Sequence, residues 1–142
     1  MLHAVPVGDR GADIDHLVVG PAGVFTLNSK HHPGARIRVA GDSFRVNGVH
    51  HPYVRNSRHE AARAGRLLTT ACGFPVTATA VLVPVNPDEV VVKRNPDEVH
   101  VINRRRLRRW LRRQEERLDK STLDRIYEAA RRPVTWSRPQ KG

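Results

Sequence analysis

The sequence is poor in cysteine and in aromatic residues. Its 142 residues include a single cysteine, Cys72, and aromatic residues make up only 5% of the chain. One cysteine excludes an intramolecular disulfide, and it also excludes a zinc site built from several cysteines. The fold must therefore be held together by the packing of its aliphatic side chains.

Long apolar runs are also missing. No run approaches the roughly 18 residues that a membrane-spanning helix needs, and the chain does not open with the basic and apolar regions of a signal peptide. The contents of 39% hydrophobic and 27% charged residues are typical of one globular domain with a packed core. These features predict a cytoplasmic protein that does not enter a membrane.

Acidic residues are scarce relative to basic ones. The chain has 25 Lys and Arg against 14 Asp and Glu, a net charge of +11, and 21 of the cations are Arg. The excess is concentrated after residue 100, where 14 cations accompany 5 anions. Because Arg binds phosphate groups bidentately, this distribution favours contact with nucleic acid. A solvated helix face is the alternative interpretation.

The order of the expected elements predicts an α/β fold in which a mixed β-sheet is flanked by helices. Segments rich in branched residues predict a hairpin over 14–27 and a second strand pair over 35–46. The nearly continuous apolar segment 76–85 is typical of a strand that is covered on both faces. Short strands are expected at 90–92 and 99–102.

Three helices are expected from their terminal signals. Ser57 and Glu60 have the spacing of a capping box, and they predict a helix that starts there and ends at Gly73. Asn103 and Ser121 are the expected N-caps of two further helices. We expect a core over 1–102, a helical pair over 103–133 packed on the same core, and a flexible tail over 134–142.

The first hairpin would gather polar groups on one face. If its loop has two or four residues centred between Pro21 and Ala22, Asp15 lies directly opposite Asn28. Lys30 then shares a face with Asn28, because side chains alternate along a strand. A carboxylate, an amide and an ammonium group would converge there. A three-residue loop with a bulge would instead shift the register by one residue and separate Asp15 from Lys30.

The run DIDHLVVGPAGVFTLNSK, residues 13–30, resembles the core of the nuclease-related domain (NERD) family of the PD-(D/E)xK restriction-endonuclease-like superfamily. The resemblance continues through the hairpin at 36–47, the helix PYVRNSRHEAARAGRLL and the strand TATAVLVPV, so it covers about residues 2–85. It implies a restriction-endonuclease-like core, hydrolysis of DNA phosphodiester bonds, and Mg²⁺ or Mn²⁺ as cofactor.

The resemblance also implies residue roles. Asp15 and Asn28 stand at the metal-ligand positions, and Lys30 stands where the family's lysine orients the attacking water, so these three residues are the candidate catalytic set. Two departures stand out: Asn28 replaces an acidic residue, and the family's N-terminal helix has no counterpart before Met1. A neutral amide offsets less of the cost of ion dehydration, which predicts attenuated activity. The alternative is a non-catalytic module that binds nucleic acid or a protein partner.

Other residues are weaker candidates. Asp13 and His32 could add metal ligands, although a salt bridge to Lys30 is the alternative for Asp13. Arg55 and Arg58 lie at the start of the first expected helix, where helix dipole and backbone amides favour an anion, and they are expected to contact phosphate.

The most basic segment is RRRLRRWLRR, residues 104–113, with seven arginines in ten positions. Leu107, Trp110 and Leu111 keep helical spacing, so we expect them to pack on the core. The outward residues would bind the phosphate backbone without reading sequence. These are Arg105, Arg108, Arg109 and Arg112. A membrane surface or a protein partner is the alternative for such a basic helix.

Overall fold

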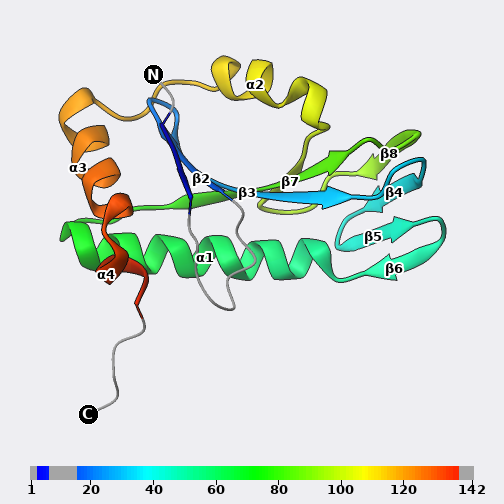
Figure 1. Cartoon of the computed structure of the whole chain (residues 1–142), viewed down its shortest axis with the longest axis horizontal. Helices are drawn as coiled ribbons and strands as arrows, with labels where there is room; N and C mark the ends of the chain where they lie inside the picture. Colours follow the sequence, from blue (N-terminus) through cyan, green and yellow to red (C-terminus); the bar gives the residue numbers. More distant parts are fainter. Residues whose placement is uncertain (1–2, 7–15, 138–142) are drawn as a thin grey trace, which may run out of the picture.

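The computed structural model of the chain describes residues 3–6 and 16–137 (Figure 1). Five strands form a central sheet in the order β1-β2-β3-β7-β9. Neighbouring strands β1, β2 and β3 are antiparallel, whereas β3, β7 and β9 are parallel, so the sheet is mixed. Its strands are β1 (His3–Pro6), β2 (His16–Gly20), β3 (Gly23–His31), β7 (Ala78–Val85) and β9 (Val99–Val101).

A second, four-stranded sheet carries the segments expected as the second strand pair. Its order is β6-β5-β4-β8, with β4 antiparallel to β5 and parallel to β8. The fold therefore has two mixed sheets where one was expected. The strands are β4 (Arg36–Ala40), β5 (Ser43–Val46), β6 (Val49–His51) and β8 (Glu89–Arg94).

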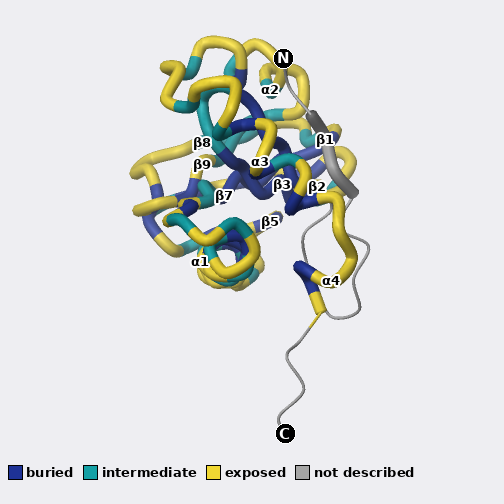
Figure 2. Tube along the Cα trace, turned by 90° about the vertical axis from the view of Figure 1, so that its left-hand side faces the viewer, coloured by how far each residue is buried: buried dark blue, intermediate teal, exposed yellow. Residues whose placement is uncertain are grey.

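Helices cover both faces of the central sheet (Figures 1 and 2). The long helix α1 lies on one face, with α3 and α4 beside it, and α2 lies on the other. The helices are α1 (Tyr53–Cys72), α2 (Arg104–Arg113), α3 (Lys120–Arg131) and α4 (Pro133–Trp136). Within the described part of the chain, no helix is long and apolar enough to cross a membrane. The expected α/β class is confirmed.

Alternation along β3 decides which side chains meet which helix. Val24 packs in a cluster with Leu68 of α1, whereas Phe25 and Leu27 pack in a cluster with Leu111 of α2. Even-numbered positions of β3 therefore face α1, and odd-numbered positions face α2. This parity places every polar side chain of the strand on a known side of the sheet.

Two helix starts were predicted wrongly. Helix α1 begins at Tyr53, and Pro52 stands at its N-cap without a side-chain hydrogen bond, so Ser57 lies inside the helix and is buried. Helix α3 begins at Lys120, because the Asp119 side chain accepts a hydrogen bond from the Thr122 backbone. In both cases the residue predicted as the cap lies inside the helix, Ser57 five residues after the N-cap Pro52 and Ser121 two residues after the N-cap Asp119.

The segment expected as a flexible tail, residues 134–142, begins with residues of a short helix. Residues 133–136 form the short helix α4, which begins with Pro133. Trp136 is buried, and its Nε1 donates a hydrogen bond of 2.8 Å to the carbonyl oxygen of Ala130. Apolar burial of the indole thus holds this segment against α3 and α1.

Candidate active site on the α1 face of β3

Asn28 and Lys30 lie on one face of β3, as predicted. Both are even-numbered positions, and the Lys30 Nζ stands 4.3 Å from the centroid of the Tyr53 ring at the start of α1. Asn28 is 7% exposed, and it has no side-chain hydrogen bond to another described residue. The amide and the ammonium group therefore share the space between β3 and α1.

An aromatic cluster holds the end of β3 against α1. The Tyr53 hydroxyl lies 3.0 Å from the Nε2 of His32, and the rings of His51 and Tyr53 stack with centroids 4.7 Å apart. Burial lowers the pKa of His32, and the neighbouring charges of His51 and Lys30 lower it further. The neutral imidazole is thus favoured, and the Lys30 ammonium rests on an aromatic face that attracts cations.

The hairpin register supports the predicted position of Asp15. Gly20 pairs with Gly23 and His16 pairs with Leu27. This is the register that the two- or four-residue loop predicts, and the alternative with a shifted register is wrong. Asp15 and Asp13 themselves lie outside the described residues, so their pairing with Asn28 and Lys30 stays a prediction.

The described residues do not contain a complete set of metal ligands. No group of three or more His, Cys, Asp or Glu side chains among them is close enough to hold a metal ion. His32 lies on the α1 face, but its Nε2 is occupied by the Tyr53 hydroxyl. Of the candidate ligands that the structure describes, Asn28 is the one whose side chain has no described protein partner.

Sequence reasoning missed Glu60, which it assigned to a helix cap. Since α1 begins at Tyr53, Glu60 lies in the second turn of the helix and has no capping role. Its Oε2 atom is buried and has no hydrogen-bond partner. The Oγ1 atom of Thr26 on β3 is likewise buried and without a partner. A buried orphaned carboxylate oxygen fits a cation site. The sequence signal was an acidic residue at the border of an apolar helix face.

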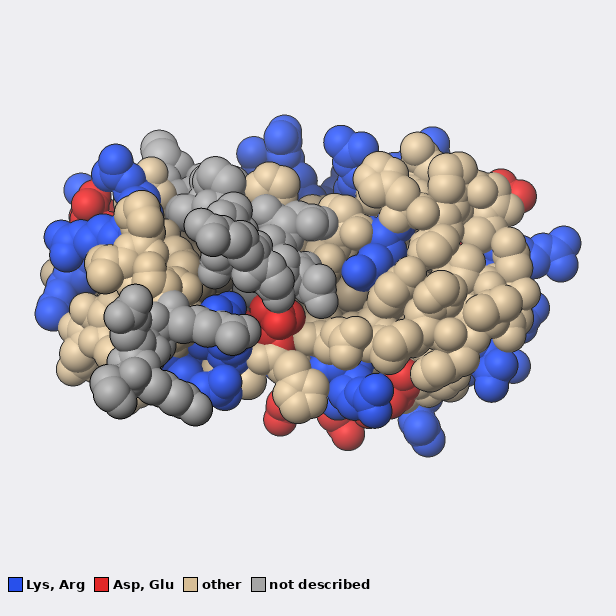
Figure 3. Space-filling model, turned by 60° about the horizontal axis from the view of Figure 1, so that its bottom comes forward, with Lys and Arg blue, Asp and Glu red and all other residues tan. Residues whose placement is uncertain are grey.

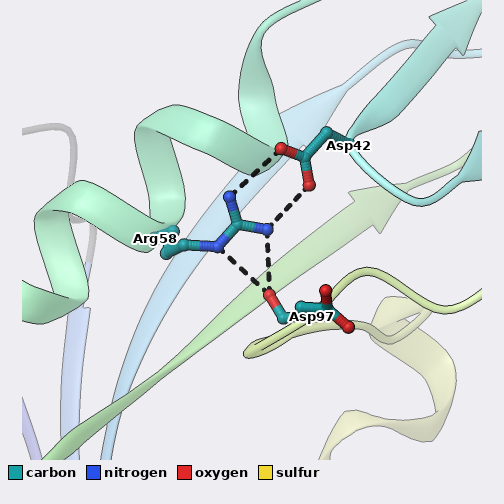
Figure 4. A network of polar contacts seen from close by, with 3 residues as sticks. All are labelled: Asp42, Arg58 and Asp97. Carbon is teal, nitrogen blue, oxygen red and sulfur yellow. Dashed lines mark hydrogen bonds and ion pairs between the residues drawn. The ribbon is translucent and has the colours of Figure 1, made fainter.

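Arg58 makes its contacts within the protein (Figure 4). Its guanidinium donates to both carboxylate oxygens of Asp42, at 2.7 and 3.2 Å, and to the carbonyl oxygen of Asp97, at 2.9 and 3.2 Å. These contacts connect α1 to the turn between β4 and β5 and to the loop before β9. A phosphate would have to compete with them, so we give Arg58 a structural role. Arg55 is exposed and stays a candidate phosphate contact.

Arg58→Gln is expected to destabilise the fold and to leave nucleic-acid affinity nearly unchanged. The pKa of Asp42 is lowered chiefly by the hydrogen bond from Arg58. A lowered carboxyl pKa stabilises the fold above about pH 4, and that contribution disappears as the pH falls through the folded-state value. Urea unfolding should therefore show a stability gap between the two proteins at neutral pH that narrows as the pH falls below about 4. A large loss of DNA affinity in the variant would restore the phosphate role.

Helix α2 lies across the sheet from Asn28 and Lys30. Leu111 is buried, and Trp110 packs edge-on against Phe25 with ring centroids 5.7 Å apart. Phe25 is an odd-numbered position of β3, so its side chain lies on the side away from α1. The expected packing of Leu111 and Trp110 is confirmed, but the basic helix does not share a face with the candidate site.

The arginines of α2 fall into two sets. One set borders a groove of about 640 Å³ between α2 and β8, with Trp110 in its wall. This groove set comprises Arg106, Arg109 and Arg113. On the other flank, Arg108 and Arg112 border a separate hollow beside Pro21. Of the four arginines of α2 that were predicted to bind phosphate, only Arg109 lines the groove with Trp110, and Arg105 lines neither of these two hollows.

Basic side chains are not confined to α2. On the α1 side of the molecule, Lys and Arg side chains lie along much of the rim, and acidic side chains lie among them at several places (Figure 3). The excess of positive charge, +11 for the whole chain, is therefore available on both sides of the central sheet. Such a distribution favours approach of a polyanion from either side.

The mixed sheet with helices on both faces, and the position of β3 at its centre, are consistent with a domain of the restriction-endonuclease-like class. The family model of the nuclease-related domain matches residues 1–85, which include β1 to β7 and α1. The chain belongs to the nuclease-related domain family, and the resemblance of residues 13–30 is confirmed. No curated protein and no solved structure matches the chain.

Proposed function

We propose that this chain is a divalent-metal-dependent phosphodiesterase that acts on DNA and is attenuated by the neutral Asn28. The observation that best supports the proposal is the shared placement of Asn28 and Lys30 on the α1 face of β3, since the resemblance to the family implies catalytic roles for these two positions. The orphaned Glu60 carboxylate oxygen, on the helix that covers this face, indicates that a cation fits nearby.

Each residue of the site has a defined task in this proposal. Asn28 Oδ1 binds the cation, and Asp15 joins it from the neighbouring strand if the register of β2 continues. Mg²⁺ or Mn²⁺, when bound, supplies positive charge to the scissile phosphate. Lys30 Nζ donates hydrogen bonds to the attacking water and to a phosphoryl oxygen, and it stabilises the negative charge that develops there. Tyr53 holds the ammonium in place for this task.

Asn28→Glu is expected to tighten Mg²⁺ binding by on the order of tenfold and to increase the cleavage rate, because it adds an anionic ligand at a position that now has a neutral one. Calorimetric titration and cleavage of labelled DNA, each in Mg²⁺ and in chelator, measure the two effects. Since Asn28 is 7% exposed, Asn28→Asp tests the same charge without added volume. Unchanged metal affinity in both variants would show that residue 28 is not a ligand.

A non-catalytic nucleic-acid-binding module is the second candidate function. It is supported by the neutral Asn28 and by the basic helix on the opposite side of the sheet. In that case DNA binding would not depend on a metal, and no condition would produce cleavage. Protein partners of the same surface belong to this alternative.

A further inference from the structure

Glu60 presents a buried carboxylate oxygen that the protein leaves without a donor. Its Oε2 has neither solvent exposure nor a hydrogen bond in the structure. An ionised carboxylate inside a protein is normally paired with a cation or with hydrogen-bond donors. The described residues provide neither for this atom, so its environment is incomplete without a further group.

The position of Glu60 along α1 brings it level with the polar part of β3. Tyr53 at the start of α1 contacts Lys30, and Leu68 near its end packs with Val24 near the start of β3, so the two elements run antiparallel. At about 1.5 Å per helical residue, Glu60 lies about 10 Å along the axis from Tyr53. At about 3.3 Å per strand residue, Asn28 lies about 7 Å from Lys30 and Thr26 about 13 Å from it. Glu60 therefore lies level with the interval between Asn28 and Thr26.

The direction of Glu60 around α1 agrees with this placement. Leu67, seven residues further on and therefore on nearly the same side of the helix, packs in the cluster that contains Leu17 of β2. Arg58 points to the other flank, toward Asp42 and Asp97. Glu60 thus lies on the flank of α1 that faces β2 and β3, and not on the flank that faces β9.

Two polar side chains of β3, Asn28 and Thr26, face this space from the sheet. Asn28 is more than nine-tenths buried, faces α1, and makes no side-chain hydrogen bond to another described residue. The Oγ1 of Thr26, on the same face of the same strand, is buried and has no partner either. Carboxylate, amide and hydroxyl oxygens are hard ligands of the kind that Mg²⁺ and Mn²⁺ prefer.

We propose that Glu60 provides, from α1, the anionic ligand that β3 lacks at Asn28. The cation would then be held between the helix and the sheet by the Glu60 carboxylate and the Asn28 amide oxygen. This inference rests on the proposed function for the presence of a divalent cation, and it adds a ligand that no position of the family motif in 13–30 supplies. It also explains how the chain could tolerate an amide at residue 28.

Titration of Mn²⁺ into the purified chain without nucleic acid tests the assignment. Glu60→Gln removes the charge with little change in volume, and it is expected to weaken Mn²⁺ binding by about tenfold or more. Glu128→Gln is the matched control, because it removes an exposed carboxylate that pairs with Arg131 on α3. The control should bind Mn²⁺ as the unmodified chain does. Glu60→Asp, which keeps the charge on a shorter side chain, should bind with intermediate affinity.

A second readout does not depend on binding curves. In chelator, Glu60→Gln should unfold at a temperature equal to or above that of the unmodified chain, because it removes the charge from a half-buried carboxylate whose Oε2 atom has no hydrogen-bond donor. Addition of Mn²⁺ should raise the unfolding temperature of the unmodified chain and leave that of Glu60→Gln almost unchanged. The melting curve in chelator also shows whether the variant is folded. If Glu60→Gln is not folded, the Mn²⁺ affinity and the unfolding temperature of Glu60→Asp are compared with those of the unmodified chain instead.

The outcomes separate this inference from the proposed function. If the unmodified chain cleaves DNA with Mn²⁺ and Glu60→Gln binds Mn²⁺ equally well, Glu60 is not a ligand and the phosphodiesterase proposal stands. If Glu60→Gln loses Mn²⁺ binding but no condition gives cleavage, the metal site stands and the catalytic proposal fails. If the unmodified chain binds no Mn²⁺ at millimolar concentration, the Glu60 assignment is overturned.

Discussion

Replacement of Lys30 by alanine is expected to lower the rate of DNA cleavage by about 10²- to 10⁴-fold, the range typical for loss of a positioned group that assists proton transfer or orients the attacking water. DNA affinity should change little, because one ammonium is a small part of the positive charge of a chain with 25 cations. Single-turnover cleavage and equilibrium binding, measured on the same labelled duplex, separate the two effects.

Lys93→Ala is the matched control for this change. Lys93 is an exposed residue of β8 in the second sheet, so its removal takes away the same charge at a distance from β3. The control should cleave at the rate of the unmodified chain. If Lys30→Ala also cleaved at that rate, Lys30 would have no part in the reaction, and the placement of the reaction centre on the α1 face would be wrong.

Removal of the groove set on α2 is expected to weaken DNA binding strongly. Arg106, Arg109 and Arg113 line one groove together with Trp110, and none of them has an ion pair among the described residues. If each of the three guanidinium groups contacts a phosphate, their replacement by glutamine should reduce the slope of log affinity against log salt by about three units. Affinity should fall equally for all DNA sequences, since phosphate contacts carry no sequence information.

The other flank of the same helix provides the control. Replacing Arg105, Arg108 and Arg112 by glutamine removes an equal charge, but these residues do not line the groove with Trp110. A smaller loss of affinity and a smaller change in slope are expected for this variant. Equal effects of the two triple substitutions would mean that the helix acts only through its net charge, and unchanged affinity in both would make α2 a solvated or partner-binding face.

The sequence predicted which residues of the site lie together on β3, but not how the helices and loops pack around them. The segment from Gly20 to Gly23, with Pro21 at its second position, is typical of a tight turn, and a loop of even length centred between Pro21 and Ala22 predicts the register that β2 and β3 have. Strand alternation then placed Asn28 and Lys30 together. Both inferences need only neighbouring residues, and for that reason they could be made without the fold.

Relations between distant elements could not be predicted in the same way. The apolar stripe of Leu107, Trp110 and Leu111 showed that α2 packs on the core, but not on which face. The face depends on the path of the chain after β9, which no local pattern encodes. The intramolecular contacts of Arg58 could not be predicted for a related reason, since its partners Asp42 and Asp97 come from two other loops.

The prediction that Glu60 belongs to a helix cap was wrong because the same sequence pattern occurs in two different structural settings. Serine followed three residues later by glutamate is typical of a capping box, yet the same spacing occurs inside a helix whose N-cap is Pro52. A proline at the N-cap supplies no side-chain acceptor, so the true start left no polar signal. Only the tertiary structure reveals that Ser57 is buried and that the Glu60 Oε2 atom is orphaned.

The most direct test of the central claim is DNA cleavage by the unmodified chain. Labelled single-stranded and double-stranded DNA should be cut in the presence of Mg²⁺ or Mn²⁺, slowly because Asn28 is neutral, and should remain intact in chelator. Loss of the metal-dependent product in Lys30→Ala would assign the activity to the α1 face of β3. Intact DNA under every metal condition, with binding retained, would contradict the account and leave a nucleic-acid-binding module on a nuclease-related fold.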